Sequence, residues 1–162
     1  MRGFILRFLL GFALLEALIY FLLWRDSWFA PYAAWNARLS AALVRPWIDG
    51  AQGFAGYLVA PGFTINIRPG CDAYQSSAVL LAGIAAFPAP RGRKLVGAAL
   101  GTLVLLGLNV LRLSLILVTG LQGKELFDTL HLEVMPAVLF LAALALWLGW
   151  MLWVRSAREP ES

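Results

Sequence analysis

The sequence predicts an all-α integral membrane protein of about four transmembrane helices, with an interfacial amphipathic helix and a short extended or hairpin segment on the outer side. Of its 162 residues, 61% are hydrophobic and 14% are charged, whereas a soluble domain is about half apolar and a quarter charged. Several runs reach the roughly 20 apolar residues that cross a bilayer. The basic residues are scattered, without the aromatic neighbours of a nucleic-acid groove, so we predict no nucleic-acid partner.

The chain is expected to form a single membrane domain over residues 1–162, in contact with the lipid bilayer. The spans are predicted at residues 3–24, 72–87, 95–119 and 132–154, with an outer segment at 25–71. The first span is long for a signal peptide and has no small-x-small cleavage site, so we expect a retained helix. The second span is short and needs residues near Cys71 to reach membrane thickness.

Two elements are predicted in the outer segment. Residues 29–50 place Arg38 and Arg45 on one helical face, with tryptophans near the interface, which is typical of an amphipathic helix lying on a membrane. Further along, β-prone runs on either side of Pro61-Gly62 indicate a short hairpin or an extended lid. The seven tryptophans of the chain suit interfacial anchors.

The basic residues also predict how the spans are oriented. With both termini and the 88–94 loop inside, seven basic residues lie on the inner side and five on the outer side. The inner seven are Arg2, Arg7, Arg91, Arg93, Lys94, Arg155 and Arg158. The positive-inside rule therefore predicts that both termini lie inside the cell.

Three solitary polar residues fall on the outer side of this topology. Cys71 and His131, the one cysteine and the one histidine, precede the second and fourth spans. Arg112 lies late in the third span, about 26 Å along it at 1.5 Å per residue. An arginine at the centre of a span costs roughly 2.5–3.5 kcal/mol, and a place near the outer edge reduces that cost. One cysteine excludes an internal disulfide and every multi-cysteine metal site, and we predict neither a metal nor a cofactor.

Each of the three suits a step of nucleophilic catalysis. A cysteine at a helix start, near a cation, has a lowered pKa, and thiolate with imidazole is a recurring pair of nucleophile and acid–base group. Arg112 can stabilise an oxyanion. The sequence therefore predicts a catalytic group of Cys71, Arg112 and His131.

Three further residues are predicted to support this group. Asn109, one turn before Arg112, can hold the guanidinium or donate to a substrate. Asp72, with a glutamine three residues on, resembles a capping box that would fix Cys71 at the helix start. Asp128 is placed to orient the ring of His131, although a solvated loop acid is an equally good reading.

These residues resemble the exosortase/archaeosortase family. The resemblance rests on a cysteine at a helix start, an Asn-x-x-Arg motif (Asn109–Arg112) and a histidine opening the last span, and it covers about residues 68–136. The family commonly has Ser-Gly or a similar small pair after the cysteine, where this chain has Asp72-Ala73.

The resemblance implies a membrane-embedded cysteine protease or transpeptidase, a hydrolase of the cytoplasmic membrane whose catalytic trio is Cys71, Arg112 and His131. The implied substrates are exported proteins with a C-terminal sorting signal made of a motif, a membrane span and a basic tail. Cleavage at the outer face would pass through a thioester on Cys71.

Two other classes remain open from the residues alone. A non-catalytic membrane scaffold or assembly subunit would use an ion pair between Arg112 and Glu16 to lock helices together. A small transporter-like protein would use Asn109 and Arg112 for an anionic solute, although the chain has no repeated halves. Neither class needs a thiol at position 71.

Overall fold

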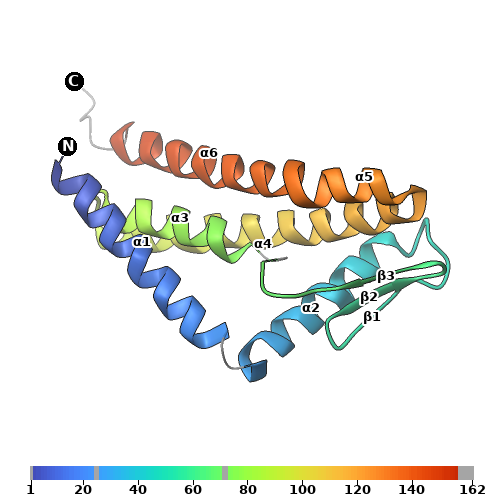
Figure 1. The fold of residues 1–162 in the computed structure, drawn as a ribbon. Helices are drawn as coiled ribbons and strands as arrows, with labels where there is room; N and C mark the ends of the chain where they lie inside the picture. The colour runs from blue at the N-terminus through green and yellow to red at the C-terminus, as the bar shows by residue number, and fades with distance from the viewer. Residues whose placement is uncertain (1, 24–25, 71–72, 157–162) are drawn as a thin grey trace.

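Helices make up most of the structure, as the composition predicts (Figure 1). The computed structural model describes residues 2–23, 26–70 and 73–156. Its elements, in chain order, are α1 (Arg2–Leu23), α2 (Asp26–Val44), β1 (Gln52–Phe54), β2 (Tyr57–Ala60), β3 (Phe63–Asn66), α3 (Tyr74–Ala86), α4 (Arg91–Gln122), α5 (Lys124–Thr129), a π-helical turn η1 (Leu130–Val134) and α6 (Met135–Ser156).

Three helical segments are long and apolar enough to cross a membrane: Arg2–Phe21, Arg91–Gln122 and Lys124–Ser156. The predicted second span is not among them, because α3 has 13 residues and reaches about 20 Å, short of the roughly 30 Å hydrocarbon core. Pro88 and Pro90 follow its end, and proline disfavours helical geometry in the residue before it. The structure therefore does not support the count of four spans.

The last helical segment begins earlier than predicted. Residues expected in a loop before 132 form α5 and η1, which run on into α6 without a break. In η1 the Met135 N–H donates to the Leu130 carbonyl oxygen, five residues back. Pro136 follows directly, and its ring clashes with the carbonyl four residues earlier, which explains the widened turn. His131 therefore lies inside a helical segment rather than at its start.

One of two apolar cores joins α3, the first part of α4, and α6. It includes Leu80, Leu105, Leu139 and Ala143. Trp150 packs against Gly97, where a Cβ would meet its indole, and its Nε1–H donates to the Arg93 carbonyl oxygen at 2.9 Å. This tryptophan is a packing residue of the bundle rather than an interfacial anchor.

The other core joins α2, the sheet and the end of α4, and it includes Ala37, Leu58, Leu113 and Leu117. The sheet is an antiparallel meander in the order β1-β2-β3. The hairpin predicted at Pro61-Gly62 is present, with Ala60 opposite Phe63. Strand β1 was not predicted, because its three residues carry no alternating pattern.

Helix α2 is the predicted amphipathic helix, and it ends at Val44 rather than near residue 50. Its face of Ala33, Ala37 and Ala41 is buried against the sheet and α4. Arg38 stays exposed on the other side. The protein itself therefore covers one face of this helix.

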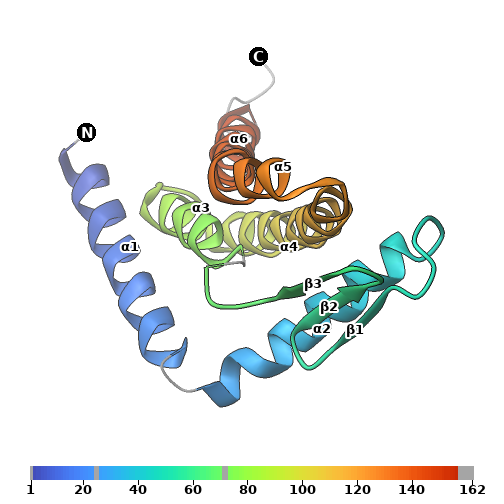
Figure 2. The same ribbon diagram turned by 45° about the vertical axis from the view of Figure 1, so that its right-hand side comes forward.

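Helix α1 lies apart from most of the bundle. It packs along α3, and Figures 1 and 2 show it leaning away from α4 and α6 towards the start of α2. No residue of Arg2–Phe21 is buried within the structure. Its apolar surface therefore suits contact with lipid.

The start of α1, the α3–α4 turn and the end of α6 lie at one end of the molecule (Figure 1). Phe4 stacks near Trp147 with ring centroids 5.9 Å apart, and Arg93 Nη1 donates to the Val154 carbonyl oxygen at 3.1 Å. Six basic residues belong to these segments: Arg2, Arg7, Arg91, Arg93, Lys94 and Arg155. We call this the basic end, and the α2–sheet unit lies at the other.

Replacement of Gly53 by alanine is expected to destabilise the α2–sheet unit. A Cβ at this position would overlap the Ala37 carbonyl group of α2, which is backbone and cannot swing aside. Overpacking of this kind costs about 1–3 kcal/mol. The control is Gly107→Ala on α4, where a Cβ meets nothing within 4 Å and stability should stay equal or rise. Thermal unfolding in detergent measures both, and equal midpoints would contradict the close approach.

Candidate functional site

Arg112 is buried on α4 at the junction of the two apolar cores. Its side chain is 4% exposed. Leu105 before it belongs to the core with α3 and α6, while Leu113 after it belongs to the core with α2 and the sheet. Arg112 lies about 32 Å along α4 from Arg91 at the basic end. That length is about one hydrocarbon thickness of a bilayer.

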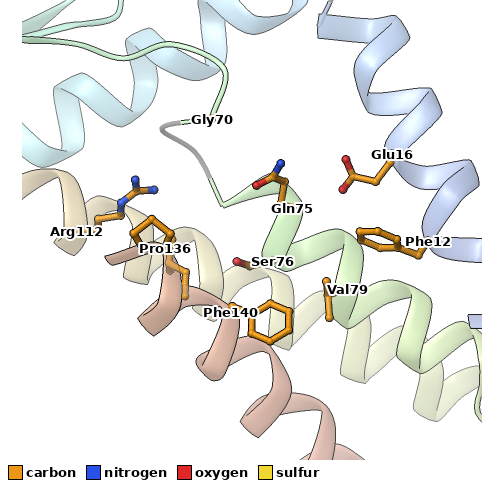
Figure 3. A pocket seen from close by; sticks show the side chains of 10 residues that line it. Phe12, Glu16, Gly70, Gln75, Ser76, Val79, Arg112, Pro136 and Phe140 are labelled. Atoms are coloured by element: carbon orange, nitrogen blue, oxygen red, sulfur yellow. The ribbon is translucent and has the colours of Figure 1, made fainter. Parts of the chain in front are cut away.

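A cleft of about 320 Å³ opens beside Arg112 (Figure 3). Four helices and the chain before α3 form its walls. Its lining consists of Phe12, Glu16, Gly70, Gln75, Ser76, Val79, Arg112, Pro136, Leu139 and Phe140. The cleft is therefore largely apolar, with a cation, a carboxylate and two neutral polar side chains set into it.

Glu16 of α1 lines this cleft without pairing with Arg112. Its Oε1 is buried and has no hydrogen-bond partner within the part of the chain that the structure describes. In Figure 3 the two charged groups lie on opposite sides of Gln75. The ion pair that a scaffold function would need is therefore absent between these two described residues.

His131 lies half-buried in η1 and interacts electrostatically with both Arg112 and Asp128. Its ring stacks on Phe127, with centroids 5.3 Å apart and planes 12° apart. Phe127 in turn meets Phe63 of β3 edge to face, at 5.1 Å. Arg112 and Asp128 are thus within electrostatic range of His131, and the aromatic contacts through Phe127 hold the imidazole against the sheet.

The predicted nucleophile Cys71 and its neighbour Asp72 lie outside the described residues. Gly70, directly before Cys71, lines the cleft. Ala73, directly after Asp72, is the N-cap residue of α3, and no side-chain hydrogen bond caps the helix. The predicted capping box of Asp72 and Gln75 involves Asp72, and it therefore stays a prediction.

Asn109 was predicted to hold the guanidinium of Arg112 or to donate to a substrate. Its Oδ1 has no hydrogen-bond partner among the described residues, so it does not hold the guanidinium. It is fully buried, and its Nδ2 donates to Asn36 Oδ1 of α2 at 3.2 Å. Asn36 Nδ2 donates in turn to the Tyr32 carbonyl oxygen at 2.9 Å. Asn109 therefore joins α2 to α4, one turn from Arg112, and supports the site by fixing these helices.

Two serines extend this polar contact between the helices. Ser40 Oγ donates to the Val110 carbonyl oxygen at 3.2 Å. Ser114 Oγ donates to the same oxygen at 2.8 Å and lies 3.4 Å from the Ser40 carbonyl oxygen. Asn36 and Ser40 were not predicted as site residues from the sequence. Their signal was present, because they lie four residues apart beside a face of alanines, and small residues with hydrogen-bonding side chains are typical of closely packed membrane helices.

The described residues contain no group of three or more His, Cys, Asp or Glu side chains arranged to hold a metal ion. What they contain is a buried guanidinium that can bind an anion, and an imidazole within electrostatic range of it. Comparisons of the chain with the known protein families, with curated proteins and with solved structures gave no match.

The pairing of Asn36 and Asn109 is expected to appear as a coupling energy. Either single change to alanine leaves the other amide buried without this partner, so the double variant should lose less stability than the sum of the two single variants. We expect a coupling of about 0.6–1.5 kcal/mol. Unfolding of the four proteins of the cycle in detergent measures it. Strictly additive losses would mean that Asn109 does not act through Asn36.

Proposed function

We propose that the protein is a membrane cysteine protease or transpeptidase of the exosortase/archaeosortase type. It cleaves C-terminal sorting signals of exported proteins through a thioester on Cys71. The observation that carries the proposal is the buried Arg112, which lies within electrostatic range of His131 and beside a cleft lined by Gly70, the residue before the thiol.

The proposed reaction assigns one role to each residue. The Cys71 thiolate attacks the scissile carbonyl carbon, and the Arg112 guanidinium stabilises the oxyanion that forms. His131 gives a proton to the leaving amine as the C–N bond breaks. The thioester is then resolved by water or by an acceptor amine, with His131 as the general base.

The cleft supplies the place for the substrate. Phe12, Val79 and Phe140 offer apolar contacts, while Gln75 and Ser76 offer hydrogen bonds to an extended backbone. An opening lined by α1 and α6 suits a substrate that is itself held in the membrane, because these two helices expose apolar side chains to lipid.

The proposed location is the cytoplasmic membrane, with the site on its outer face. Support comes from the six basic residues at the basic end, since inner loops carry an excess of lysine and arginine. Arg112 lies about 32 Å away along α4, near the opposite edge of the apolar layer.

A scaffold or assembly subunit is the second candidate. The face of α1 that points away from α3 favours it, because an apolar helix without a buried residue offers a surface to a partner protein. This candidate predicts no bond cleavage and no role for the thiol.

Replacement of Cys71 by alanine is expected to abolish cleavage of a co-expressed exported protein carrying a C-terminal sorting signal. The protein should still accumulate in the membrane, and the wild type should be labelled at this single cysteine by a membrane-impermeant maleimide added from outside. Intact-mass measurement of a thioester on Cys71 provides the direct evidence. Cleavage that survives the change removes Cys71 as nucleophile and favours the scaffold.

Replacement of Arg112 by glutamine is expected to lower the rate of thioester formation about 100-fold, because an oxyanion donor is lost. Arg112→Lys should recover part of this rate, since it restores the charge without the planar fork of donors. The control is Arg38→Gln on the exposed face of α2, which should leave the rate unchanged. Equal rates for Arg112→Gln and wild type would contradict the role of Arg112.

A further inference from the structure

A second hollow lies at the basic end, away from the cleft beside Arg112. It is a groove of about 570 Å³ between α1, α3 and α4. Leu15, Leu81, Leu95 and Ala98 form its apolar walls, and Arg91 and Lys94 are the charged residues that line it. The groove is thus apolar along its length and cationic at one end.

The two cations are placed one turn apart on the face of α4 that lines the groove. Arg91 is exposed. Lys94 Nζ donates to the Ala85 carbonyl oxygen at 2.6 Å, which holds the ammonium at the end of α3. An ammonium has three N–H donors, so two remain for a ligand. Among the residues that the structure describes, no acidic one lines the groove.

We propose that this groove binds an anionic glycerophospholipid, with its phosphate at Arg91 and Lys94 and an acyl chain along Leu15 and Ala98. The ligand must be both anionic and long and apolar. A free phosphate would leave the apolar length of the groove empty, and a neutral lipid would leave the two cations without a counter-charge. Basic pockets between membrane helices on the inner side are a known kind of site for anionic head groups.

The groove also opens to the bilayer. Leu14 and Leu95 at its edges are each 71% exposed, so a lipid reaches it sideways from the membrane. From Arg91 to Ala98 is about 10 Å along α4, which extends from head-group level into the acyl region. Because α1 packs on α3 and leans away from α4, a chain in this groove fills the gap beside it.

The test compares phosphatidylglycerol with phosphatidylcholine as probes. The full chain is reconstituted in vesicles of an equal mixture of the two, extracted in mild detergent, and analysed by native mass spectrometry for retained lipid. We expect the wild type to retain phosphatidylglycerol, and the double variant Arg91→Gln/Lys94→Gln to lose this preference about tenfold. The matched control removes two exposed charges of the same end outside the groove, Arg2→Gln/Arg155→Gln, and should change it less than twofold.

A second variant tests the apolar part with both cations intact. Ala98→Phe fills the groove, and it should reduce retention of phosphatidylglycerol while the thermal midpoint in detergent stays within a few degrees. If Arg91→Gln/Lys94→Gln and Arg2→Gln/Arg155→Gln lose the preference for phosphatidylglycerol equally, only the summed charge of the basic end attracts lipid. Unchanged retention in Ala98→Phe would mean that no chain lies in the groove. Either result overturns the proposal.

Discussion

The burial of one permanent charge in a long apolar helix constrains much of this structure. Arg112 cannot lose its proton, so it must lie where polar groups and the edge of the apolar layer compensate it. Arg112 lies at the junction of the two cores, beside a largely apolar cleft into which Gln75, Ser76 and Glu16 are set. Helix α4 continues past Arg112, and its last turns support the sheet.

The two apolar cores have different structural roles. The core of α3, α4 and α6 has the length and apolar surface of a membrane bundle, while the core of α2 and the sheet fixes what lies beyond Arg112. The stack of Phe63, Phe127 and His131 connects the sheet to the turn before α6. The position of the imidazole thus depends on strand pairing far from it in the chain, which is why rigid packing in the sheet matters to the site.

Long apolar runs made the spanning helices predictable, because hydrophobicity over about 20 residues is a strong signal. The hairpin at Pro61-Gly62 was predictable from its turn residues. Helix α3 was predicted at 72–87, close to its observed bounds of Tyr74–Ala86, but it was wrongly counted as a span. The helix before His131 was not predicted, because it depends on a local effect of proline and on packing that no run of hydrophobicity records. The role of Asn109 was also beyond prediction from the sequence. Its spacing from Arg112 correctly placed both residues on one face of α4, but its hydrogen-bond partner Asn36 is 73 residues away in the chain.

Glu16 lies across the cleft from Arg112, and the two residues together affect how a bound peptide is oriented. An ionisable residue inside a span tends to face a cavity and to mark a functional pathway, and this one faces the same cleft as Arg112 from the other side. A single trans peptide group points its C=O and its N–H in opposite directions. Under the proposed function, a segment that turns its scissile carbonyl to Arg112 presents donors towards Glu16, whereas the reversed segment meets like partial charges at both ends. In a cleft with apolar walls such interactions are poorly screened, so the guanidinium and the carboxyl oxygens of Glu16 together favour the orientation in which Arg112 can stabilise an oxyanion.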